Sequence, residues 1–531
     1  MDALVIYAIA AGGVLILLFL IKIMVSLSHR THLLTIPLSR HFTLRVLVPR
    51  RRLFGPWTWA NVCLFISYVA INVFLVLFRA RTLAGAGRRA GTLALINFIF
   101  PLSTIHASSL ADILGIYLRT CQKVHGATSW MGVVLLSVHV VLAIAERPRF
   151  LLSESQNLYT TIGAASLGIL ALLSLPWFRR WSYEVFLRGH QCLTGLFVYG
   201  VWRHLPLRNR APGVYLTIAL ALCGLNLVVT LLIFLYGNGL FAGHGAPRAV
   251  MSYASRESTK ANSEEASGAA IKIRLALPRP LKVEAGQYIN VWIPGVSLWA
   301  CTQTHPFMVT SWSRGKQLTL DLLVQPRRGL SKDFLSHVQA VPESSVSFLA
   351  LFSGPHGISE DVSHCESATV VASGSGIAAT IPYLKKMIYG YNTCTSQVRR
   401  LHLVWQVVSI DVAISAQDLL NQLLEDDIMD DGYILNISIY VEHGLMQDKL
   451  PFGKHQRACL YQGRPHFESL ISEEASGKLI ERLPNIRDEQ GQLLVMVSAT
   501  DSIRYKLREI VREYLHQRVK LSELEYQPMA D

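Results

Sequence analysis

The sequence is poor in charged residues, which make up 16% of its 531 positions, whereas hydrophobic residues make up 51%. The mean hydropathy of +0.34 is too high for a purely soluble enzyme, because a chain of this size needs a polar surface to stay in water. Its eight cysteines form no Cys-x-x-Cys pair, which excludes the common zinc and dithiol motifs. We therefore expect a membrane protein without a structural zinc site.

Acidic residues are scarce in the first part of the chain. Residues 1–240 contain 5 Asp and Glu against 21 Lys and Arg, whereas residues 241–531 contain 31 against 29. The net charge of +14 therefore belongs entirely to the apolar part. Basic chains often bind nucleic acid, but these arginines stand between long apolar runs, as in loops that flank a membrane. This pattern excludes a nucleic-acid partner and favours membrane lipid.

Seven apolar segments are each close to the ~20 residues that a spanning helix needs. Asp2 precedes the first segment and basic residues follow it, which predicts an uncleaved helix with its N-terminus outside. The arginines of residues 28–57 place that loop in the cytosol, so seven crossings leave the C-terminal half cytosolic as well. The segments cover residues 3–27, 58–79, 91–118, 126–145, 158–178, 190–205 with its flanks, and 214–237.

Four histidines in these segments form a pattern, and histidine inside a membrane points to a function. His125 and His139 are 14 residues apart, and His190 and His204 repeat that interval. Fourteen residues are close to four helical turns, so each pair shares one helix face over about 21 Å. One helix separates the two segments, so they run parallel. The first histidine of one segment is then predicted to face the first histidine of the other. His106 has no partner at this interval and is interpreted as structural.

This pairing predicts two iron porphyrin sites, each held by two imidazoles. His125 with His190 would form the inner site, toward the cytosol, and His139 with His204 the outer site. Two imidazole ligands leave no open position on the iron, which favours electron transfer over oxygen binding at the metal. Electrons that enter from the cytosol could then cross the membrane.

The later half of the chain changes to short alternating stretches. Residues 244–268 are rich in Ser, Ala and charge, as in a mobile linker. Strand-like residues at 271–277, 287–293 and 317–325 then predict a small antiparallel barrel. An α/β nucleotide-binding domain is predicted by strand-like residues at 368–373, 402–408, 434–441 and 493–499, with helices between them such as 418–427.

A glycine turn follows the first strand of that α/β domain. Gly374, Ser375 and Gly376 separate the strand from a helix that is predicted to begin at Ile377. Bare backbone and a helix N-terminus together suit a phosphate group. The turn lacks the full Gly-x-Gly-x-x-Gly pattern, and ordinary turn chemistry is the alternative for this motif taken alone.

In this order, the motifs resemble the fungal ferric reductase branch of the ferric reductase and NADPH oxidase superfamily over nearly the whole chain. The resemblance implies a transmembrane di-haem domain at residues 1–243 and a linker at 244–268. It further implies a ferredoxin-reductase-like module, with an FAD-binding barrel at 269–365 and an NAD(P)-binding domain at 366–531.

The resemblance also assigns site residues. The family's flavin motif resembles His305, Pro306 and Phe307, and a terminal aromatic near the flavin resembles Tyr526. Its flavin-phosphate stretch resembles Arg327, Gly329 and Ser331. The nucleotide-binding glycine motifs of the family, expected to hold NADPH, resemble Gly354 and Pro355 and then Gly374, Gly376 and Ile377.

These assignments imply electron transfer from NADPH, with NADH as the alternative donor, through FAD and two b-type haems. Ferric or cupric chelates are the expected acceptors, at the plasma membrane or, alternatively, an endomembrane. Seven segments and equal 14-residue intervals favour this reading over a superoxide-forming oxidase that uses dioxygen. A haem sensor without turnover and a biosynthetic reductase with an organic acceptor stay open. The sequence gives no indication of oligomeric state.

Three positions depart from the family pattern. Met308 stands where relatives carry Thr or Ser, whose hydroxyl can hydrogen-bond the flavin. Ser498-Ala499-Thr500 stands in place of Cys-Gly-Pro near the nicotinamide, and Val408 in place of an arginine that contacts the 2′-phosphate of NADPH. The first two departures are the features that favour the sensor.

Overall fold

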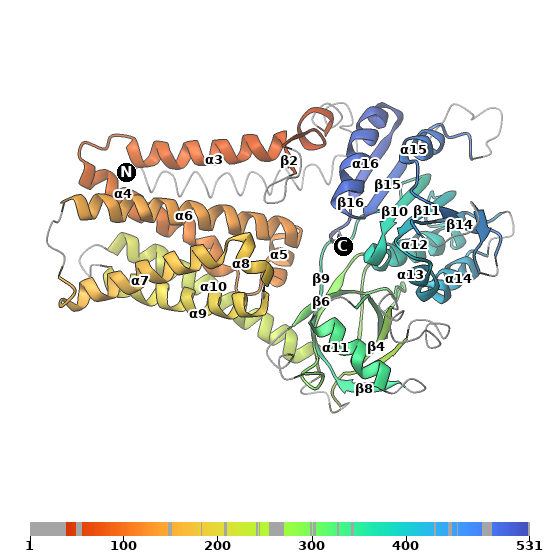
Figure 1. Ribbon diagram of the computed structural model, residues 1–531, viewed down its shortest axis with the longest axis horizontal. Coiled ribbons are helices and arrows are strands. Elements are labelled where there is room, and N and C mark those ends of the chain that lie inside the picture. The colour runs from red at the N-terminus through yellow and green to blue at the C-terminus, as the bar shows by residue number, and fades with distance from the viewer. Residues whose placement is uncertain are drawn as a thin grey trace. The chain divides into compact units, whose positions relative to one another are not determined.

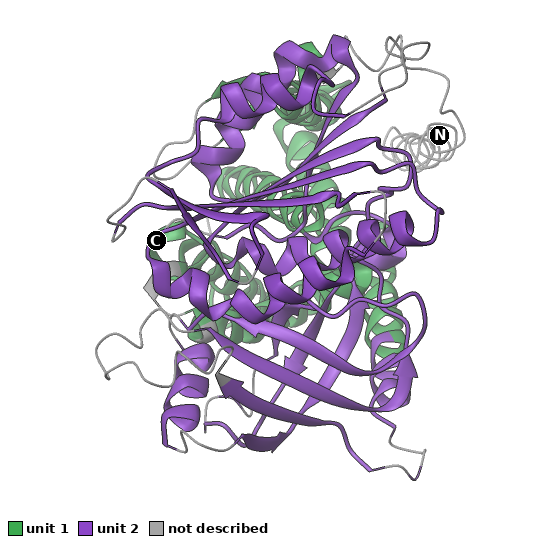
Figure 2. Ribbon diagram, turned by 90° about the vertical axis from the view of Figure 1, so that its right-hand side faces the viewer, with its two compact units in different colours: residues 1–110, 119–229 green, residues 111–118, 230–531 purple. Residues whose placement is uncertain are grey.

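The chain divides into two compact units in the computed structural model, residues 1–110 with 119–229, and residues 111–118 with 230–531 (Figure 2). The first unit is helical, and the second combines two β-sheet domains. The structure describes residues 39–48, 56–146, 151–181, 183–205, 210–239, 243, 245–253, 270–297, 300, 304–326, 329–340, 345–428, 432–443, 449–453, 455–480 and 491–528.

Long apolar helices make up most of the first unit (Figure 1). Among the described residues, four helices are long and apolar enough to cross a membrane, namely α3, α6, α7 and α10. The predicted segment 3–27 lies outside the described residues. The helices are α3 (Trp59–Leu77), α4 (Leu83–Ser103), α5 (Ala107–Leu114), α6 (Leu118–Glu146), α7 (Ser155–Leu173), α8 (Pro176–Trp181), α9 (Tyr183–His204) and α10 (Arg210–Gly237).

The predicted apolar segment at 91–118 is broken in the structure, because the chain bends there by 102° between α4 and α5. Pro101 lies in the last turn of α4, and a proline lacks the N–H that would continue the helix. The backbone N–H of Thr104 instead donates to the Pro101 carbonyl and ends the helix. The bent pair is apolar enough to form one further span. Helix α9 is less apolar than the others, because Glu184, Arg188 and Arg203 lie within it.

Two glycines allow α7 and α9 to pack closely. A Cβ atom added at Gly200 of α9 would lie 2.7 Å from the Cα atom of Gly163 in α7. Backbones that approach this closely leave room only for hydrogen at those positions, as is common between membrane helices. The outer faces of the unit carry exposed apolar side chains such as Leu64, Leu225 and Leu232. These faces suit contact with lipid.

Two antiparallel sheets form the first domain of the second unit. The strand orders are β7-β4-β3-β8 and β6-β5-β9. Burial alternates along β4, so Ile271, Ile273 and Leu275 enter one core with Phe334 of helix α11. The elements are β3 (Arg248–Tyr253), β4 (Ile271–Leu281), β5 (Tyr288–Trp292), β6 (His305–Met308), β7 (Gln317–Val324), α11 (Leu330–Ala340), β8 (Val346–Leu349) and β9 (Leu351–His356).

Strand β3 lies within residues 244–268, where the sequence predicts a linker. It pairs with both β4 and β8, so residues 248–253 belong to the barrel. Ala249 and Met251 are fully buried on one face of this short strand. The linker prediction is therefore wrong at these six positions. The alternation of a strand this short does not stand out in a segment that is rich in Ser and Ala.

A seven-stranded sheet of order β13-β14-β12-β11-β10-β15-β16 forms the second domain. All its neighbouring strands are parallel except β13 and β14. The strands are β10 (Ser367–Ser373), β11 (Arg400–Val407), β12 (Leu435–Val441), β13 (Lys449–Pro451), β14 (Ala458–Gln462), β15 (Leu493–Ser498) and β16 (Val519–Glu523). The longer helices are α12 (Ile377–Asn392), α13 (Ile410–Ser415), α14 (Gln417–Asp426), α15 (Phe467–Ala475) and α16 (Asp501–Tyr514).

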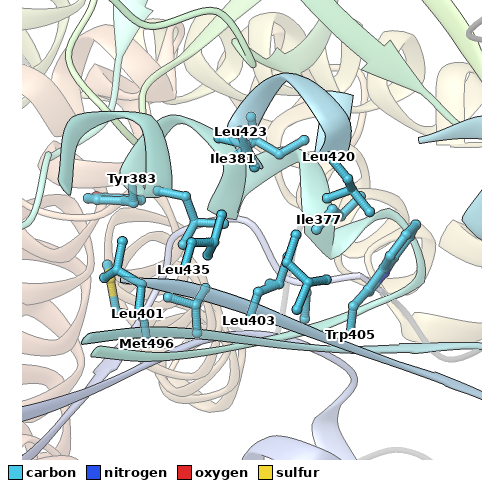
Figure 3. Packing of buried hydrophobic residues seen from close by; sticks show 14 of the residues in the cluster. Ile377, Ile381, Tyr383, Leu401, Leu403, Trp405, Leu420, Leu423, Leu435 and Met496 are labelled. Atoms are coloured by element: carbon cyan, nitrogen blue, oxygen red, sulfur yellow. The ribbon is translucent and has the colours of Figure 1, made fainter. Parts of the chain in front are cut away.

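Helices cover both faces of this sheet, which is why β10 and β15 are buried at every position. On one face, Ile377 and Leu420 from the helices pack over Leu403, Trp405 and the neighbouring strands (Figure 3). Phe467 of α15 and Leu507 of α16 cover the other face. The predicted fold class is confirmed: a polytopic helical domain, then an antiparallel barrel and an α/β domain.

A buried carboxylate joins β11 to α15. The side chain of Glu474 is 3% exposed, and its oxygens accept hydrogen bonds from Arg400 at 2.9 and 3.0 Å and lie 2.9 Å from His402 Nδ1. Burial alone raises the pKa of Glu474, but the hydrogen bonds from His402 and Arg400 hold it below its usual value. A depressed carboxyl pKa stabilises the fold above the pKa of the unfolded state, and that contribution is lost as pH falls.

We expect Glu474→Gln to lower the free energy of unfolding by about 3 kcal/mol at pH 7, because the partly buried Arg400 is left without its charge partner. The deficit should shrink as the pH falls through the pKa of Glu474. Denaturant unfolding of the purified protein, followed by tryptophan fluorescence at several pH values, measures the loss of unfolding free energy and its dependence on pH. A deficit that does not change with pH would show that packing, rather than charge, accounts for the loss.

Candidate functional site

The four paired histidines face each other at two levels between α6 and α9. The ring centres of His125 and His190 are 6.1 Å apart, and those of His139 and His204 are 6.3 Å apart. The first histidine of α6 therefore faces the first of α9, and the second faces the second, as the 14-residue intervals predict.

These distances fit a metal ion between the rings of each pair. A bond from a metal to an imidazole nitrogen is about 2 Å, and the ring centre lies about 1 Å further away, so two ligands place their ring centres about 6 Å apart. Both pairs match this value. An iron held by two imidazoles, as in a haem, fits each level.

Hydrogen bonds fix which ring nitrogen is left free to bind a metal. The Nδ1 atom of His125 lies 2.6 Å from Thr104 Oγ1, and that of His204 lies 2.8 Å from Thr160 Oγ1. Each threonine hydroxyl donates its own proton to a backbone carbonyl of α4 or α7. The hydroxyl oxygen must then accept from Nδ1–H, which leaves the lone pair on Nε2 for the metal.

His139 is held in the same way by the backbone of α4. Its Nδ1 atom lies 2.8 Å from the carbonyl oxygen of Gly87, and a Cβ atom at Gly91 would come within 2.9 Å of the same nitrogen. Glycine at position 91 therefore lets the ring lie against α4. Nδ1 of His190 has no hydrogen-bond partner among the residues that the structure describes. Three of the four rings thus have a fixed tautomer.

The flavin motif forms strand β6 of the barrel. Pro306 is exposed, whereas the Phe307 ring lies 6.1 Å from that of Phe334 and packs against the barrel core. Met308 is buried opposite Tyr288 of β5. Met308 is therefore a packing residue here, in the position where the family resemblance predicts a hydroxyl.

The residues that resemble the family's flavin-phosphate stretch lead into helix α11. Gly329 has a φ of 60°, and its carbonyl accepts from the backbone N–H groups of Lys332 and Asp333. Ser331 is the second residue of the helix, so its backbone lies at the positive end of the helix dipole, which suits an anion. Arg327 lies outside the described residues.

The segment Gly354-Pro355-His356-Gly357 ends β9 and is joined to helix α5. His356 is 5% exposed, and its Nδ1 atom lies 2.6 Å from Asp112 Oδ2. The backbone N–H of Gly357 donates to the other oxygen of Asp112 at 2.9 Å. The His356 ring also contacts that of Tyr288, at 5.7 Å between centres. One carboxylate from residues 111–118 therefore fixes this turn.

Further hydrogen bonds join residues 111–118 to the rest of the second unit. The Tyr117 hydroxyl donates to Glu360, and the backbone N–H of Leu118 donates to Glu525 at 2.5 Å. The backbone N–H of Glu360 donates to the hydroxyl of Tyr383 at 3.0 Å. Burial raises the pKa of Tyr383 to about 12, so this hydroxyl stays protonated. Helix α6, which carries His125, begins at Leu118.

One feature of the sequence marks this junction. Asp112 is one of only five acidic residues in positions 1–240. A carboxylate in an apolar region needs a partner, and that rarity could have marked Asp112 as functional. Its partner, His356, lies 244 residues away and carries no local pattern.

The glycine turn after β10 lies against the end of β15. A Cβ atom at Gly376 would lie 2.0 Å from the carbonyl oxygen of Ser498, so no other residue fits there. Gly374 has a φ of 48°, in the left-handed region that favours glycine. Its carbonyl accepts from the indole N–H of Trp405 at 2.9 Å. Ile377 then begins α12, as predicted.

A shallow hollow opens beside this turn. Its walls include Gly374, Ser375 and Trp405, with Gln325 from the barrel domain. The hollow adjoins the carboxyl ends of β10 and β11, next to the point where strand order reverses between β10 and β15, which is where open α/β sheets bind ligands. Tyr526 lies at the same turn, with its hydroxyl 2.8 Å from Ser375 Oγ.

Two family models match the chain. Residues 90–201 match the ferric reductase like transmembrane component, and residues 256–360 match an FAD-binding domain. The first match covers three of the four paired histidines, and the second covers the flavin motif and both residues Gly354 and Pro355. The second match begins inside the predicted linker, at residue 256.

Curated relatives are fungal. The chain is 26% identical over 340 residues to the probable cell surface ferric reductase kap2 of Aspergillus oryzae, covering 60% of this chain and 43% of that protein. It is 24% identical over 314 residues to ferric reductase transmembrane component 3 of Saccharomyces cerevisiae, covering 56% and 40%. The chain thus spans less than half the length of these relatives.

Among solved structures, ferredoxin-NADP+ reductase from Plasmodium falciparum matches 52% of this chain and 96% of its own, with 14% identity and a TM-score of 0.33. The assignment of the fold depends on the strand orders above and not on this likeness. The resemblance to the fungal ferric reductases, predicted from the motifs, is confirmed by the two family models and the fungal relatives together.

Proposed function

We propose that this chain is a transmembrane oxidoreductase that passes electrons from a reduced nicotinamide nucleotide, through FAD and two b-type haems, to an acceptor across the membrane. The observation that carries this proposal is the pair of facing imidazoles at two levels, with ring centres 6.1 and 6.3 Å apart, in a chain that also matches an FAD-binding domain. Two haems in series can transfer electrons across a membrane only if a cytosolic domain supplies those electrons.

The chain's own residues hold and orient these groups. When bound, FAD would supply the chemistry that links a two-electron hydride donor to haems that each carry one electron. His125 and His190 would hold the inner iron, and His139 and His204 the outer iron. Thr104, Thr160 and the Gly87 carbonyl keep the Nδ1 proton in place, so that three rings present Nε2 to the metal. The start of α11 would hold the flavin phosphates, and the turn at Gly374 the nucleotide.

The acceptor proposed here is a ferric or cupric chelate. Relatives carry the names ferric reductase and, for component 2 of Saccharomyces cerevisiae, ferric/cupric reductase. We place the chain in the plasma membrane, with the nucleotide site in the cytosol and the outer haem toward the far side.

Reduction of a ferric chelate by membranes that contain this chain tests the acceptor. The assay measures ferrous iron with and without superoxide dismutase, beside dye reduction that detects superoxide. Iron reduction that is insensitive to the dismutase is expected. Dismutase-sensitive dye reduction without direct iron reduction would instead identify a superoxide-forming oxidase.

A sensor without turnover is the second candidate, because Met308 is buried against Tyr288 and offers no hydroxyl toward the flavin site. In a sensor, the nucleotide would bind without reducing the flavin. Bleaching of the flavin absorbance by a reduced nucleotide in purified protein rules this candidate out.

We expect Asp112→Ala to slow the reduction of the haems by about tenfold more than it slows the reduction of the flavin. The change leaves the buried His356 ring and the Gly357 N–H without their partner, a loss of about 1–3 kcal/mol. It also loosens residues 111–118, from which α6 continues toward His125. Stopped-flow absorbance separates the two rates.

The control for Asp112→Ala is Asp418→Ala, since Asp418 is exposed on α14. This variant should behave as the unmodified chain. Equal slowing of flavin and haem reduction in Asp112→Ala would mean that the residue serves general stability rather than the passage of electrons.

A further inference from the structure

The carboxyl ends of β11 and β12 extend the edge of the sheet that holds the glycine turn. Neighbouring strands lie about 4.8 Å apart, so β12 is about 10 Å from β10 along this edge. A dinucleotide with its phosphates at Gly374 and Ser375 reaches that far, and it places the ribose of the adenosine near the end of the second strand, β11. The charges there decide whether a 2′-hydroxyl or a 2′-phosphate is accepted.

The end of β11 is uncharged and is followed by an acid. Val408 is 51% exposed directly after the strand. Asp411 lies exposed in the first turn of α13, and the next residue, Val412, lines the hollow beside Gly374. Residues 408–411 contain no lysine or arginine.

The end of β12 carries a second acid. Glu442 follows the strand directly, and its Oε1 atom accepts from Gln406 at 2.5 Å and from Arg464 at 3.1 Å. Partial burial raises the pKa of Glu442, but the hydrogen bonds from Arg464 and Gln406 outweigh it and keep the carboxyl ionised. Gln406 holds this carboxylate beside the end of β11.

Cations are scarce along this edge. In the connections that directly follow β10, β11, β12, β14 and β15, Arg464 is the one lysine or arginine among the described residues. Its side chain is 76% exposed, and its charge is already matched by Glu442. A 2′-phosphate, with nearly two negative charges, would have to displace Glu442 from Arg464 and would still face Asp411.

We infer that NADH, rather than NADPH, is the preferred donor, with Asp411 and Glu442 as the residues that set this preference. A ribose 2′-hydroxyl can donate a hydrogen bond to a carboxylate at the end of the second strand, whereas a 2′-phosphate is repelled by it. The inference rests on the proposed function, since it concerns the donor of the same electron path. It reverses the donor that the family resemblance implies.

Binding and flavin reduction together test this inference. The purified full-length chain is titrated with NAD+ and with NADP+ to obtain the two dissociation constants. Flavin bleaching is then followed after mixing with NADH or with NADPH. We expect NAD+ to bind at least about tenfold more tightly, a difference of about 1.4 kcal/mol, and NADH to bleach the flavin faster.

Variants show whether Asp411 and Glu442 set the preference for NAD+ over NADP+. The double variant Val408→Arg with Asp411→Asn should remove or reverse the preference, mainly by tightening NADP+ binding. Glu442→Gln should tighten NADP+ binding as well, because it removes a charge and frees Arg464. Asp418→Asn, on the exposed side of α14, serves as the matched control and should keep the unmodified ratio.

The outcomes separate this inference from the proposed function. If NADP+ binds more tightly than NAD+ and NADPH bleaches the flavin, the inference is wrong and the electron path stands. Equal binding of the two nucleotides also overturns it. Binding of NAD+ without any bleaching by NADH supports the nucleotide preference and removes the proposed function, leaving the sensor.

Discussion

Changing His139 to alanine is expected to halve the b-type haem absorbance that dithionite develops, because one of two bis-imidazole sites loses a ligand. Transfer to the acceptor should fall by at least about a hundredfold, since the outer haem is the last carrier and the loss of a hydrogen bond to a metal ligand alone costs about 10–100-fold. Flavin reduction by the nucleotide should keep its rate, because it precedes the haems.

His106→Ala is the matched control for this result. His106 lies in the same helical region but has no counterpart at the 14-residue interval. Its loss should leave the haem spectrum and its amplitude unchanged. If His139→Ala and His106→Ala lower the absorbance equally, the histidines act through the stability of the helices and not as iron ligands.

Changing Gly376 to alanine is expected to abolish nucleotide-driven flavin reduction, with a loss of at least about a hundredfold. The new Cβ atom would lie 2.0 Å from the Ser498 carbonyl oxygen, so the turn after β10 must move away from β15. This displacement moves the backbone that faces the nucleotide phosphates. We also expect a loss of stability of about 1–3 kcal/mol, as for other overpacked sites.

Gly315→Ala is the control, because a Cβ atom there meets nothing within 4 Å. Dithionite-reduced haem should be unaffected in both variants, since the paired histidines lie in the other unit. Normal nucleotide binding and flavin bleaching in Gly376→Ala would contradict the assignment of this turn to the nucleotide.

Local patterns in the sequence predicted the sheet and the histidine pairs well. The strand of residues 368–373 is observed as β10, and the helix of 418–427 as α14, because each carries its own periodicity. The pairing of His125 with His190 followed from helix geometry alone, as an interval repeated on two parallel helices leaves one arrangement. The phosphate position of Arg327 lies outside the described residues and stays a prediction.

Other features depend on contacts that no local pattern carries. The bend after Pro101 lies within an apolar run, and hydropathy does not distinguish a straight span from a broken one. The second acid at the nucleotide edge, Glu442, acquires its meaning only when β12 pairs with β11. The same holds for the bond between Asp112 and His356, which joins residues far apart in the chain. These features follow from tertiary structure.

The most direct test of the electron path is an anaerobic difference spectrum of the purified, unmodified chain, reduced first with a nicotinamide nucleotide and then with dithionite. We predict that the nucleotide alone develops most of the b-type absorbance that dithionite can reveal, after bleaching the flavin. Haem that only dithionite can reduce would contradict the path from nucleotide to haem, and the absence of haem would contradict the assignment of the four histidines.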